Sequence, residues 1–327
     1  MKAIITTGAG GPEVLALSEV SAPTPGPGEV LIDVIAAGIN RADVQQRRGF
    51  YPPPPGASNI LGLEVSGRIA AFGTNVTKPF SIGQKVVALL TGGGYAAQVC
   101  VPAGQVLPLP EGIDVISAAG LPEVAATVHS NLFMTAQLQA GETVLIHGGA
   151  GGVGAMAIQL AKEAGARVIA TAGSDEKVAM LTSYLGADLA INYRTDDFVE
   201  RVKEFTEGHG ANVILDVVGA KYLARNVEAL ATYGRLVVIG LQGGAAAELN
   251  LGALLTKRAA IIGTTLRARP VEEKQAIMEG VHQHVWPLVA SSAVKPMVDR
   301  TFPLEQVAAA HEYLDSGEHV GKVLLTL

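Results

Sequence analysis

The chain has 327 residues, a length that suggests about two domains. Hydrophobic residues make up 49% of it and charged residues only 17%, which is a globular rather than a disordered composition. The net charge of −6, without a Lys/Arg cluster, argues against nucleic acid as a main partner, because phosphate neutralisation needs a clustered basic surface. The single cysteine, Cys100, excludes an internal disulfide and a cysteine-rich zinc site, so we expect a reducing compartment, the cytoplasm.

No stretch of the sequence predicts a membrane span, which needs about 20 predominantly apolar residues. The longest uncharged run, 86–110, contains glycines and prolines that would break a lipid-exposed helix. The apolar stretch before Thr6 is too short for a signal peptide. We therefore expect neither a membrane partner nor a targeting segment.

The N-terminal third of the chain predicts short strands separated by turn residues. Between them, Pro52–Pro55 must be extended, because each proline fixes its own φ and disfavours helix in the residue before it. This part is expected to be a β-rich, barrel-like domain with a stiff loop after Tyr51. The expected strands are Lys2–Thr6, Glu29–Ala37, Val65–Phe72, Gln84–Leu90 and Tyr95–Pro102.

From Pro122 onwards, helical segments alternate with apolar strands. A helix is predicted over 123–139, ended by Gly141, and runs such as Leu236–Ile239 are apolar throughout, as in strands buried on both faces. Six such strands alternating with helices predict an α/β domain with a doubly wound parallel sheet. The expected strands are Val144–His147, Arg167–Thr171, Leu189–Asn192, Val213–Val217, Arg235–Gly240 and Ala260–Thr264.

The C-terminal tail is too short to form a domain alone. It predicts helices over 271–284 and 304–316 and strands over 298–302 and 322–326. We therefore expect it to return to the N-terminal part. The predicted domains are then a β-rich one over 1–121 and 267–327, and an α/β one over 122–266 inserted into it.

A glycine-rich turn joins the first strand of the α/β domain to a helix. Gly149, Gly151 and Gly154 satisfy G-x-G-x-x-G, whose glycines allow a tight turn, close approach of a pyrophosphate and close helix packing. The helix start, with Gly152 and Val153, would offer backbone N–H groups to the phosphates. The motif alone is a weak signal, but its strand–turn–helix context predicts a dinucleotide site; a purely structural turn is the alternative.

The end of the next strand bears on the choice between NAD and NADP. In NAD-preferring folds an Asp or Glu about 20 residues further on binds the ribose hydroxyls. Here no carboxylate ends the strand; Gly173 and Ser174 leave room for a 2′-phosphate, which Lys177 and Tyr193 could contact. The carboxylates at 175–176 would repel a phosphate if they faced it, and helix capping by Ser174 is the structural alternative. NADP is favoured.

The sequence shows no metal or hydrolase motif. The seven histidines form no zinc-ligand pattern with a cysteine or with one another. No serine lies in a G-x-S-x-G elbow, and Cys100 lies in an apolar strand, where a core role is expected.

Several segments resemble the medium-chain dehydrogenase/reductase superfamily. These are 38–43, 47–56, 61–67 and the glycine turn, which occur in the superfamily's order over essentially the whole chain. Within the superfamily the chain resembles the zinc-free quinone oxidoreductases; its closest likeness, through 51–64 and 263–269, is to their tumour-suppressor-inducible branch. The resemblance implies a Rossmann domain for the cofactor and a GroES-like catalytic domain.

The resemblance also implies chemistry without a metal. Zinc alcohol dehydrogenases of the superfamily place a cysteine ligand where this chain has Asn40 and a histidine where it has Leu63. With both ligands missing, no Lewis acid would polarise an alcohol. What is implied is hydride transfer from NADPH to an acceptor that needs little activation, such as a quinone, whose reduction restores aromaticity.

Site residues follow from the same resemblance. Asn40, Asp43 and Tyr51 would line the cleft near the nicotinamide, and Tyr51 would position the acceptor or relay a proton. Helix capping is the alternative for Asn40 and Asp43, and loop anchoring for Tyr51. The near relative has a serine at Gly151, so a role of that hydroxyl does not transfer. Further implied cofactor contacts, each of which could equally be scaffold, are Thr127, Gly240, Leu241, Leu266 and Lys322.

The function expected from these features is NADPH-dependent quinone oxidoreduction. One alternative is an NADPH-dependent reductase of α,β-unsaturated carbonyls; another, from the likeness to zeta-crystallin, is a non-catalytic NADPH-responsive binding protein. The expected partners are a small quinone or conjugated carbonyl and a second copy of the chain. The copies would pair through the short apolar edge strand over 259–264, unless the chain's own loop covers that edge.

Overall fold

The computed structural model describes residues 1–327, which divide into two compact units. Unit 1 comprises Met1–Ala126 and Leu266–Leu327, and unit 2 comprises Thr127–Thr265. The boundaries between the units along the chain therefore fall at 126/127 and 265/266, whereas the sequence suggested 121/122 and 266/267. None of the helices combines the length and apolar character that crossing a membrane requires.

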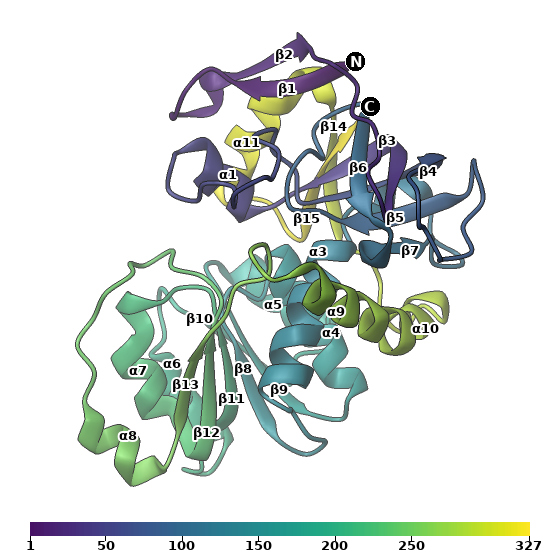
Figure 1. Ribbon diagram of the computed structural model, residues 1–327. Helices are drawn as coiled ribbons and strands as arrows, with labels where there is room; N and C mark the ends of the chain where they lie inside the picture. The colour runs from purple at the N-terminus through teal and green to yellow at the C-terminus, as the bar shows by residue number, and fades with distance from the viewer. The chain divides into compact units, whose positions relative to one another are not determined.

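Unit 2 is built on a six-stranded parallel sheet with the order β10-β9-β8-β11-β12-β13 (Figure 1). The strand order reverses between β8 and β11, so the predicted doubly wound α/β fold is confirmed. Residues of β8 are buried throughout, which explains the continuous apolar runs. The strands are β8 (Thr143–Ile146), β9 (Arg167–Ala172), β10 (Leu189–Asn192), β11 (Ala211–Asp216), β12 (Leu230–Val238) and β13 (Ala260–Gly263).

Helices cover both faces of this sheet. Figure 1 shows α6 and α7 on one side and α4 on the other. Each turns apolar side chains toward the strands; α4, for example, buries Met156, Ile158 and Leu160. The helices are α4 (Gly152–Glu163), α5 (Asp175–Ser183), α6 (Phe198–Phe205), α7 (Leu223–Ala229) and α8 (Leu251–Lys257), with a 3₁₀ turn at Ala220–Tyr222.

The single helix predicted over 123–139 was wrong. The structure has α3 (Pro122–Val128) followed by a π-helix over His129–Thr135. The Thr127 carbonyl accepts bonds from Ser130 Oγ at 3.2 Å and from Asn131 Nδ2 at 2.8 Å. These side chains compete with backbone N–H groups for that carbonyl, a local effect that apolar periodicity does not reveal.

Unit 1 contains a seven-stranded sheet with the order β14-β15-β3-β4-β5-β7, in which β6 also pairs with β3, and a separate β1–β2 ribbon. The C-terminal β15 pairs antiparallel with β3, with Val323 opposite Ile39, so the tail completes the sheet of the N-terminal segment. The strands are β1 (Lys2–Thr6), β2 (Leu15–Glu19), β3 (Glu29–Ile39), β4 (Glu64–Phe72), β5 (Lys85–Leu89), β6 (Gln98–Pro102), β7 (Val106–Pro108), β14 (Val298–Pro303) and β15 (Lys322–Thr326).

Several elements of unit 1 differ from the sequence prediction; strands β2 and β7 and the helices over 115–118 and 286–290 were not predicted. The strand expected from Tyr95 begins only at Gln98, because Tyr95 N donates to Leu61 O and Tyr95 O accepts from Ile4 N, outside the β3–β6 ladder. Helix α1 (Arg41–Arg47) was not predicted. The other helices are α2 (Val115–Ala118), α9 (Val271–His284), α10 (Trp286–Ala290) and α11 (Val307–Ser316), with 3₁₀ turns at Pro12–Val14, Ala103–Gln105 and Leu304–Gln306.

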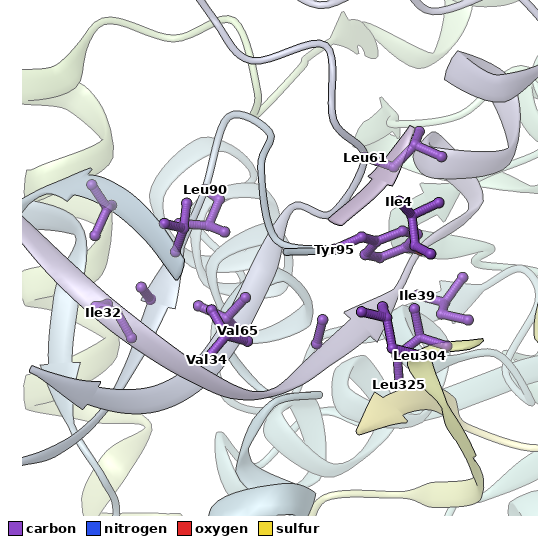
Figure 2. Packing of buried hydrophobic residues seen from close by; sticks show 14 of the residues in the cluster. Ile4, Ile32, Val34, Ile39, Leu61, Val65, Leu90, Tyr95, Leu304 and Leu325 are labelled. Atoms are coloured by element: carbon purple, nitrogen blue, oxygen red, sulfur yellow. The ribbon is translucent and has the colours of Figure 1, made fainter. Parts of the chain in front are cut away.

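The core of unit 1 fixes the strands that carry its polar residues. Figure 2 shows Ile39, Leu304 and Leu325 turned toward one another, and Tyr95 beside Ile4. All five are at most 3% exposed. Full burial of each aliphatic side chain contributes about 1.5–3 kcal/mol. This packing holds the end of β3 against β15, whose first residue is Lys322.

Candidate functional site

Packing requires glycine at two positions of the turn between β8 and α4. A Cβ at Gly154 would overlap the Gly148 carbonyl oxygen, and one at Gly149 would lie 2.9 Å from Leu181 and 3.0 Å from Ala170. Gly151 differs, because its φ is −79° and an added Cβ would have no neighbour closer than 3.5 Å. The turn therefore needs glycine at 149 and 154 and accepts a side chain at 151.

The start of α4 presents backbone donors. Gly151 is the N-cap and has no side chain with which to bond them. The N–H groups of Gly152, Val153 and Gly154 have no intrahelical acceptor and lie at the positive end of the helix dipole. This geometry fits a pyrophosphate, as the sequence predicted.

A buried polar network beneath the turn was missed by the sequence analysis. His147 Nε2 lies 2.8 Å from Asn226 Oδ1, and His147 Nδ1 lies 3.3 Å from Thr171 Oγ1. Thr171 Oγ1 also accepts the Gly148 N–H at 3.3 Å. Asp216, on the neighbouring strand, accepts two backbone N–H groups of the segment that follows it. The network fixes the ends of β8, β9 and β11; its one sequence signal was the position of His147 directly before the glycines.

His147 predicts a pH dependence of stability. Its ring is buried against Phe198 and Tyr222, and this burial lowers its pKa from 6.5 to about 4. Between these values the unfolded chain binds a proton that the folded chain does not, so stability falls as the pH falls, by about 3 kcal/mol over the whole window. His147→Gln lacks this titration. The stability advantage of wild type over the variant, measured by urea unfolding, should shrink as the pH falls from 6.5 to 4; a constant difference would contradict the assignment.

The residues expected to select NADP lie around one turn. β9 ends without a carboxylate, and Ser174 caps α5 by accepting the Lys177 N–H at 3.4 Å. The Tyr193 hydroxyl lies beside Gly173, where an added Cβ would be 2.5 Å from it. The capping alternative for Ser174 is therefore present, and contact of Gly173, Lys177 and Tyr193 with a 2′-phosphate stays a prediction.

The two carboxylates that argued against a phosphate lie differently. Asp175 Oδ1 accepts a hydrogen bond from Asn192 Nδ2 at 2.7 Å, so this carboxylate is engaged with β10. Glu176 is exposed, and bonds from its own backbone and from the Ser174 hydroxyl lower the pKa of its carboxyl. Of these two carboxylates, Glu176 is therefore the one that bonds to the Ser174 hydroxyl.

Three further predicted contacts lie in unit 2. Gly240 follows β12, and an added Cβ would be 2.8 Å from the Val217 carbonyl oxygen, after β11. It therefore lies at the carboxyl edge of the sheet, as the glycine turn does. Leu241 is 57% exposed, whereas Thr127 is buried in α3. Their cofactor roles stay predictions.

Asn40, Glu64 and Lys322 form a buried polar cluster in unit 1. Lys322 Nζ lies 2.6 Å from Asn40 Oδ1, 2.7 Å from Glu64 Oε1 and 2.8 Å from Ile39 O. Asn40 Nδ2 donates to Glu64 Oε1 at 2.9 Å, and Glu64 Oε2 accepts the Glu123 N–H at 2.9 Å. All three N–H groups of the ammonium have acceptors within unit 1. The sequence analysis missed Glu64, although it noted the Gly-Leu-Glu triplet.

This cluster does not fit a catalytic zinc ion. Zinc takes thiolate, imidazole or carboxylate ligands, whereas the two expected ligand positions hold an amide, Asn40, and an apolar side chain, Leu63. The one carboxylate, Glu64, already binds the Lys322 ammonium, whose charge would repel a second cation. No group of three or more His, Cys, Asp and Glu residues in the chain could hold a metal ion.

Asp43 joins two segments of unit 1. Its Oδ2 accepts the Asn40 N–H at 2.8 Å at the start of α1, and its Oδ1 accepts the Gly62 N–H at 3.0 Å. Burial raises its pKa to about 6, against the opposing effect of these bonds. The Tyr95 hydroxyl bonds to it as well. The capping alternative is therefore present for Asp43, and a catalytic role stays a prediction.

Tyr51 is half-buried and lies over a guanidinium. The Arg267 Cζ is 5.4 Å from the centroid of the Tyr51 ring, and Arg267 Nη1 donates to Tyr51 O at 3.4 Å. Burial raises the pKa of Tyr51, so the phenol keeps its proton at neutral pH and can donate a hydrogen bond. Leu266 was predicted from the sequence, whereas its neighbour Arg267, which carries the charge, was not.

Comparison with known proteins identifies the family. Residues 26–111 match the alcohol dehydrogenase GroES-like domain, and residues 152–282 match the family described as zinc-binding dehydrogenase. The quinone oxidoreductase of Rattus norvegicus is 34% identical over 100% of this chain and 98% of its own length. The Escherichia coli quinone oxidoreductase complexed with NADPH has a TM-score of 0.88 and 33% identity over 100% of both chains. The CurK enoyl reductase has a TM-score of 0.87 and 29% identity over 99% of this chain and 98% of its own.

These matches confirm the expected pairing of a GroES-like domain with a Rossmann domain. They extend over both units, so the likeness is not confined to the cofactor fold that many unrelated enzymes share. The chain therefore belongs to the quinone oxidoreductases of the medium-chain dehydrogenase/reductase superfamily and is an NAD(P)-dependent oxidoreductase.

Proposed function

We propose that the protein is an NADPH-dependent quinone oxidoreductase that works without a metal ion. The full-length likeness to quinone oxidoreductases supports this, as does the likeness to one solved with NADPH. The observation that carries it is the Asn40–Glu64–Lys322 cluster, in which an internal ammonium binds the only carboxylate. The acceptor must then take a hydride without a Lewis acid, and a quinone does so because its product is aromatic.

Within this proposal the chain binds and orients, and the cofactor supplies the chemistry. When bound, NADPH supplies a hydride, which together with one proton converts a quinone to a hydroquinone and leaves NADP⁺. The N–H groups at the start of α4 hold the pyrophosphate. Gly173, Ser174, Lys177 and Tyr193 surround the 2′-phosphate, and the Tyr51 phenol donates a hydrogen bond to the acceptor. Thr127, Gly240, Leu241 and Leu266 are retained as proposed cofactor contacts; Lys322, whose ammonium already has three acceptors, would bond to the cofactor only by exchanging one of them.

A reductase of α,β-unsaturated carbonyls is the second candidate. The likeness to the CurK enoyl reductase favours it. Both reactions place a hydride on a conjugated acceptor, so the same bound cofactor would serve either one. The difference lies in which acceptor fits beside Tyr51, a property of the loop after α1.

The experiment that tests this proposal compares NADPH oxidation with an ortho-quinone, a para-quinone and a 2-alkenal, each repeated with NADH and with Tyr51→Phe. We expect oxidation with quinones, a preference for NADPH and a slower Tyr51→Phe variant. Activity with the alkenal alone would favour the second candidate. Cofactor binding without oxidation of any acceptor would refute both and support an NADPH-responsive binding protein.

We further propose that two copies pair through β13. This strand forms one edge of the sheet in unit 2, and the preceding helix α8 exposes Leu251 by 62% and Leu255 by 76%. An open apolar edge is commonly covered by a partner strand, and a two-fold axis would pair Ala260–Gly263 with its own copy. Light scattering should give twice the mass of one chain.

The single cysteine keeps the cytoplasm as the proposed compartment.

A further inference from the structure

Arg267 is a buried guanidinium with an unused nitrogen. The residue is 4% exposed, and its Nη2 has no hydrogen-bond partner. Its Nε donates to Thr91 O at 2.8 Å, and its Nη1 donates to Tyr51 O at 3.4 Å. The Nε and Nη1 groups therefore bind backbone carbonyl oxygens, whereas the N–H groups of Nη2 have no acceptor. A buried donor without an acceptor is costly, and more so when it is charged, which points to a partner at this place.

The surroundings of Arg267 carry an excess of positive charge. Lys274 is also buried, and its Nζ donates to Thr91 Oγ1 at 2.7 Å and to the Arg267 carbonyl oxygen at 3.3 Å. All these acceptors are neutral oxygens. The acidic group that acts on Arg267 through space is Asp43, whose two oxygens are already bound by backbone N–H groups. An oxygen that carries negative charge, or acquires it, would match this excess of positive charge.

The backbone beside Nη2 lacks a side chain. Gly92 has a φ of +152°, and a Cβ added there would lie 3.5 Å from Nη2 and 2.8 Å from the Ser58 carbonyl oxygen. On the guanidinium lies the half-exposed ring of Tyr51, in a loop that Gln46 Nε2 holds at its far end by a bond of 3.0 Å to Asn59 O.

We propose that Arg267 binds the acceptor: its Nη2–H donates to the quinone oxygen that becomes negatively charged during reduction. This inference rests on the proposed function and names a residue for it. The hydride brings two electrons and one hydrogen nucleus to the quinone; the resulting hydroquinone monoanion takes its second proton from water, and NADP⁺ is left. Because Nη2 is held in place beforehand, it binds the anionic oxygen more tightly than the neutral carbonyl. Lys274 strengthens that preference by its charge.

Binding of 4-nitrophenolate to the protein without cofactor tests this directly. The probe mimics the hydroquinone monoanion, and its colour reports its ionisation. We expect the pKa of the bound phenol to lie below that of the free phenol. Arg267→Gln should weaken phenolate binding roughly 10- to 100-fold and remove most of the pKa shift, and Arg267→Lys should retain part of both.

Arg269→Gln is the matched control. It removes one positive charge two residues away in the chain. The Arg269 guanidinium lies 3.8 Å from Glu273, in the first turn of α9. Its charge is already opposed by that of Glu273, so phenolate binding should change by less than about twofold. Circular dichroism and melting temperature establish that each variant is folded.

Four outcomes would overturn the inference. The first two need no variant: no binding of the phenolate to wild type, or a bound phenol with an unshifted pKa. The third is a folded Arg267→Gln protein that binds the probe like wild type, which would reduce Arg267 to a clamp on Tyr51. The fourth is displacement of the probe by NADP⁺ together with an equal loss of NADP⁺ affinity in Arg267→Gln, which would assign Nη2 to the cofactor. Failure of quinone turnover with these binding results intact would refute the proposed function alone.

Discussion

Gly154→Ala should abolish NADPH binding and lower the free energy of unfolding by about 1–3 kcal/mol. The added Cβ would overlap the carbonyl oxygen of Gly148 and lie 2.6 Å from the Cα of Gly149. Both are backbone atoms of the turn itself, so they cannot swing aside as the end of a flexible side chain would. The start of α4 would be pushed away from the turn, and the N–H groups proposed to hold the pyrophosphate would lose their common direction. Fluorescence titration with NADPH and urea unfolding measure the two effects.

Gly151→Ser is the control for this prediction. Gly151 has φ −79° and ψ 170°, which any residue adopts, and an added Cβ has no neighbour closer than 3.5 Å. A serine there could cap α4, so stability should be unchanged or rise by roughly a few tenths of a kcal/mol, and NADPH should still bind. Wild-type NADPH affinity in Gly154→Ala would place the cofactor elsewhere. Equal destabilisation by both substitutions would show that the turn does not have the described packing.

The fold of unit 2 could be predicted because its signals are local. Each strand is a short apolar run ended by turn residues, and the glycine turn is contiguous in sequence. The errors arose where side chains compete with the backbone, as Ser130 and Asn131 do at the π-helix, or where a residue bonds to distant segments, as Tyr95 does. Neither effect leaves a periodic trace.

The candidate site divides in the same way. Asn40, Asp43 and Tyr51 were found because they lie in segments that resemble a known family. Glu64 and Lys322 meet because β4 and β15 both neighbour β3, an adjacency that no stretch of sequence reveals. Arg267 was not predicted for a similar reason: its partners, Thr91 and Tyr51, come from two loops far from it in the chain. Charge and spacing along the sequence carry no information about such contacts between distant residues.

Lys322→Met should destabilise the protein by about 3–5 kcal/mol, because it leaves the Glu64 carboxylate buried without its counter-charge. Glu64 is 0% exposed, and after the substitution it keeps only the bonds from Asn40 Nδ2 and the Glu123 N–H. Methionine fills a similar volume, so the loss would report charge rather than a cavity. Urea unfolding of the folded variant measures it.

The double variant Glu64→Gln/Lys322→Met separates the charge from the packing. A neutral amide at 64 can still accept the Glu123 N–H with its single oxygen, and it needs no ammonium, so the double variant should be more stable than Lys322→Met alone. If the stability losses of Glu64→Gln and Lys322→Met add up to the loss in the double variant, Glu64 and Lys322 do not interact energetically, despite the 2.7 Å between Nζ and Oε1. A positive coupling would show that this internal ion pair ties the start of β15 to the start of β4, with Asn40 bonded to both partners.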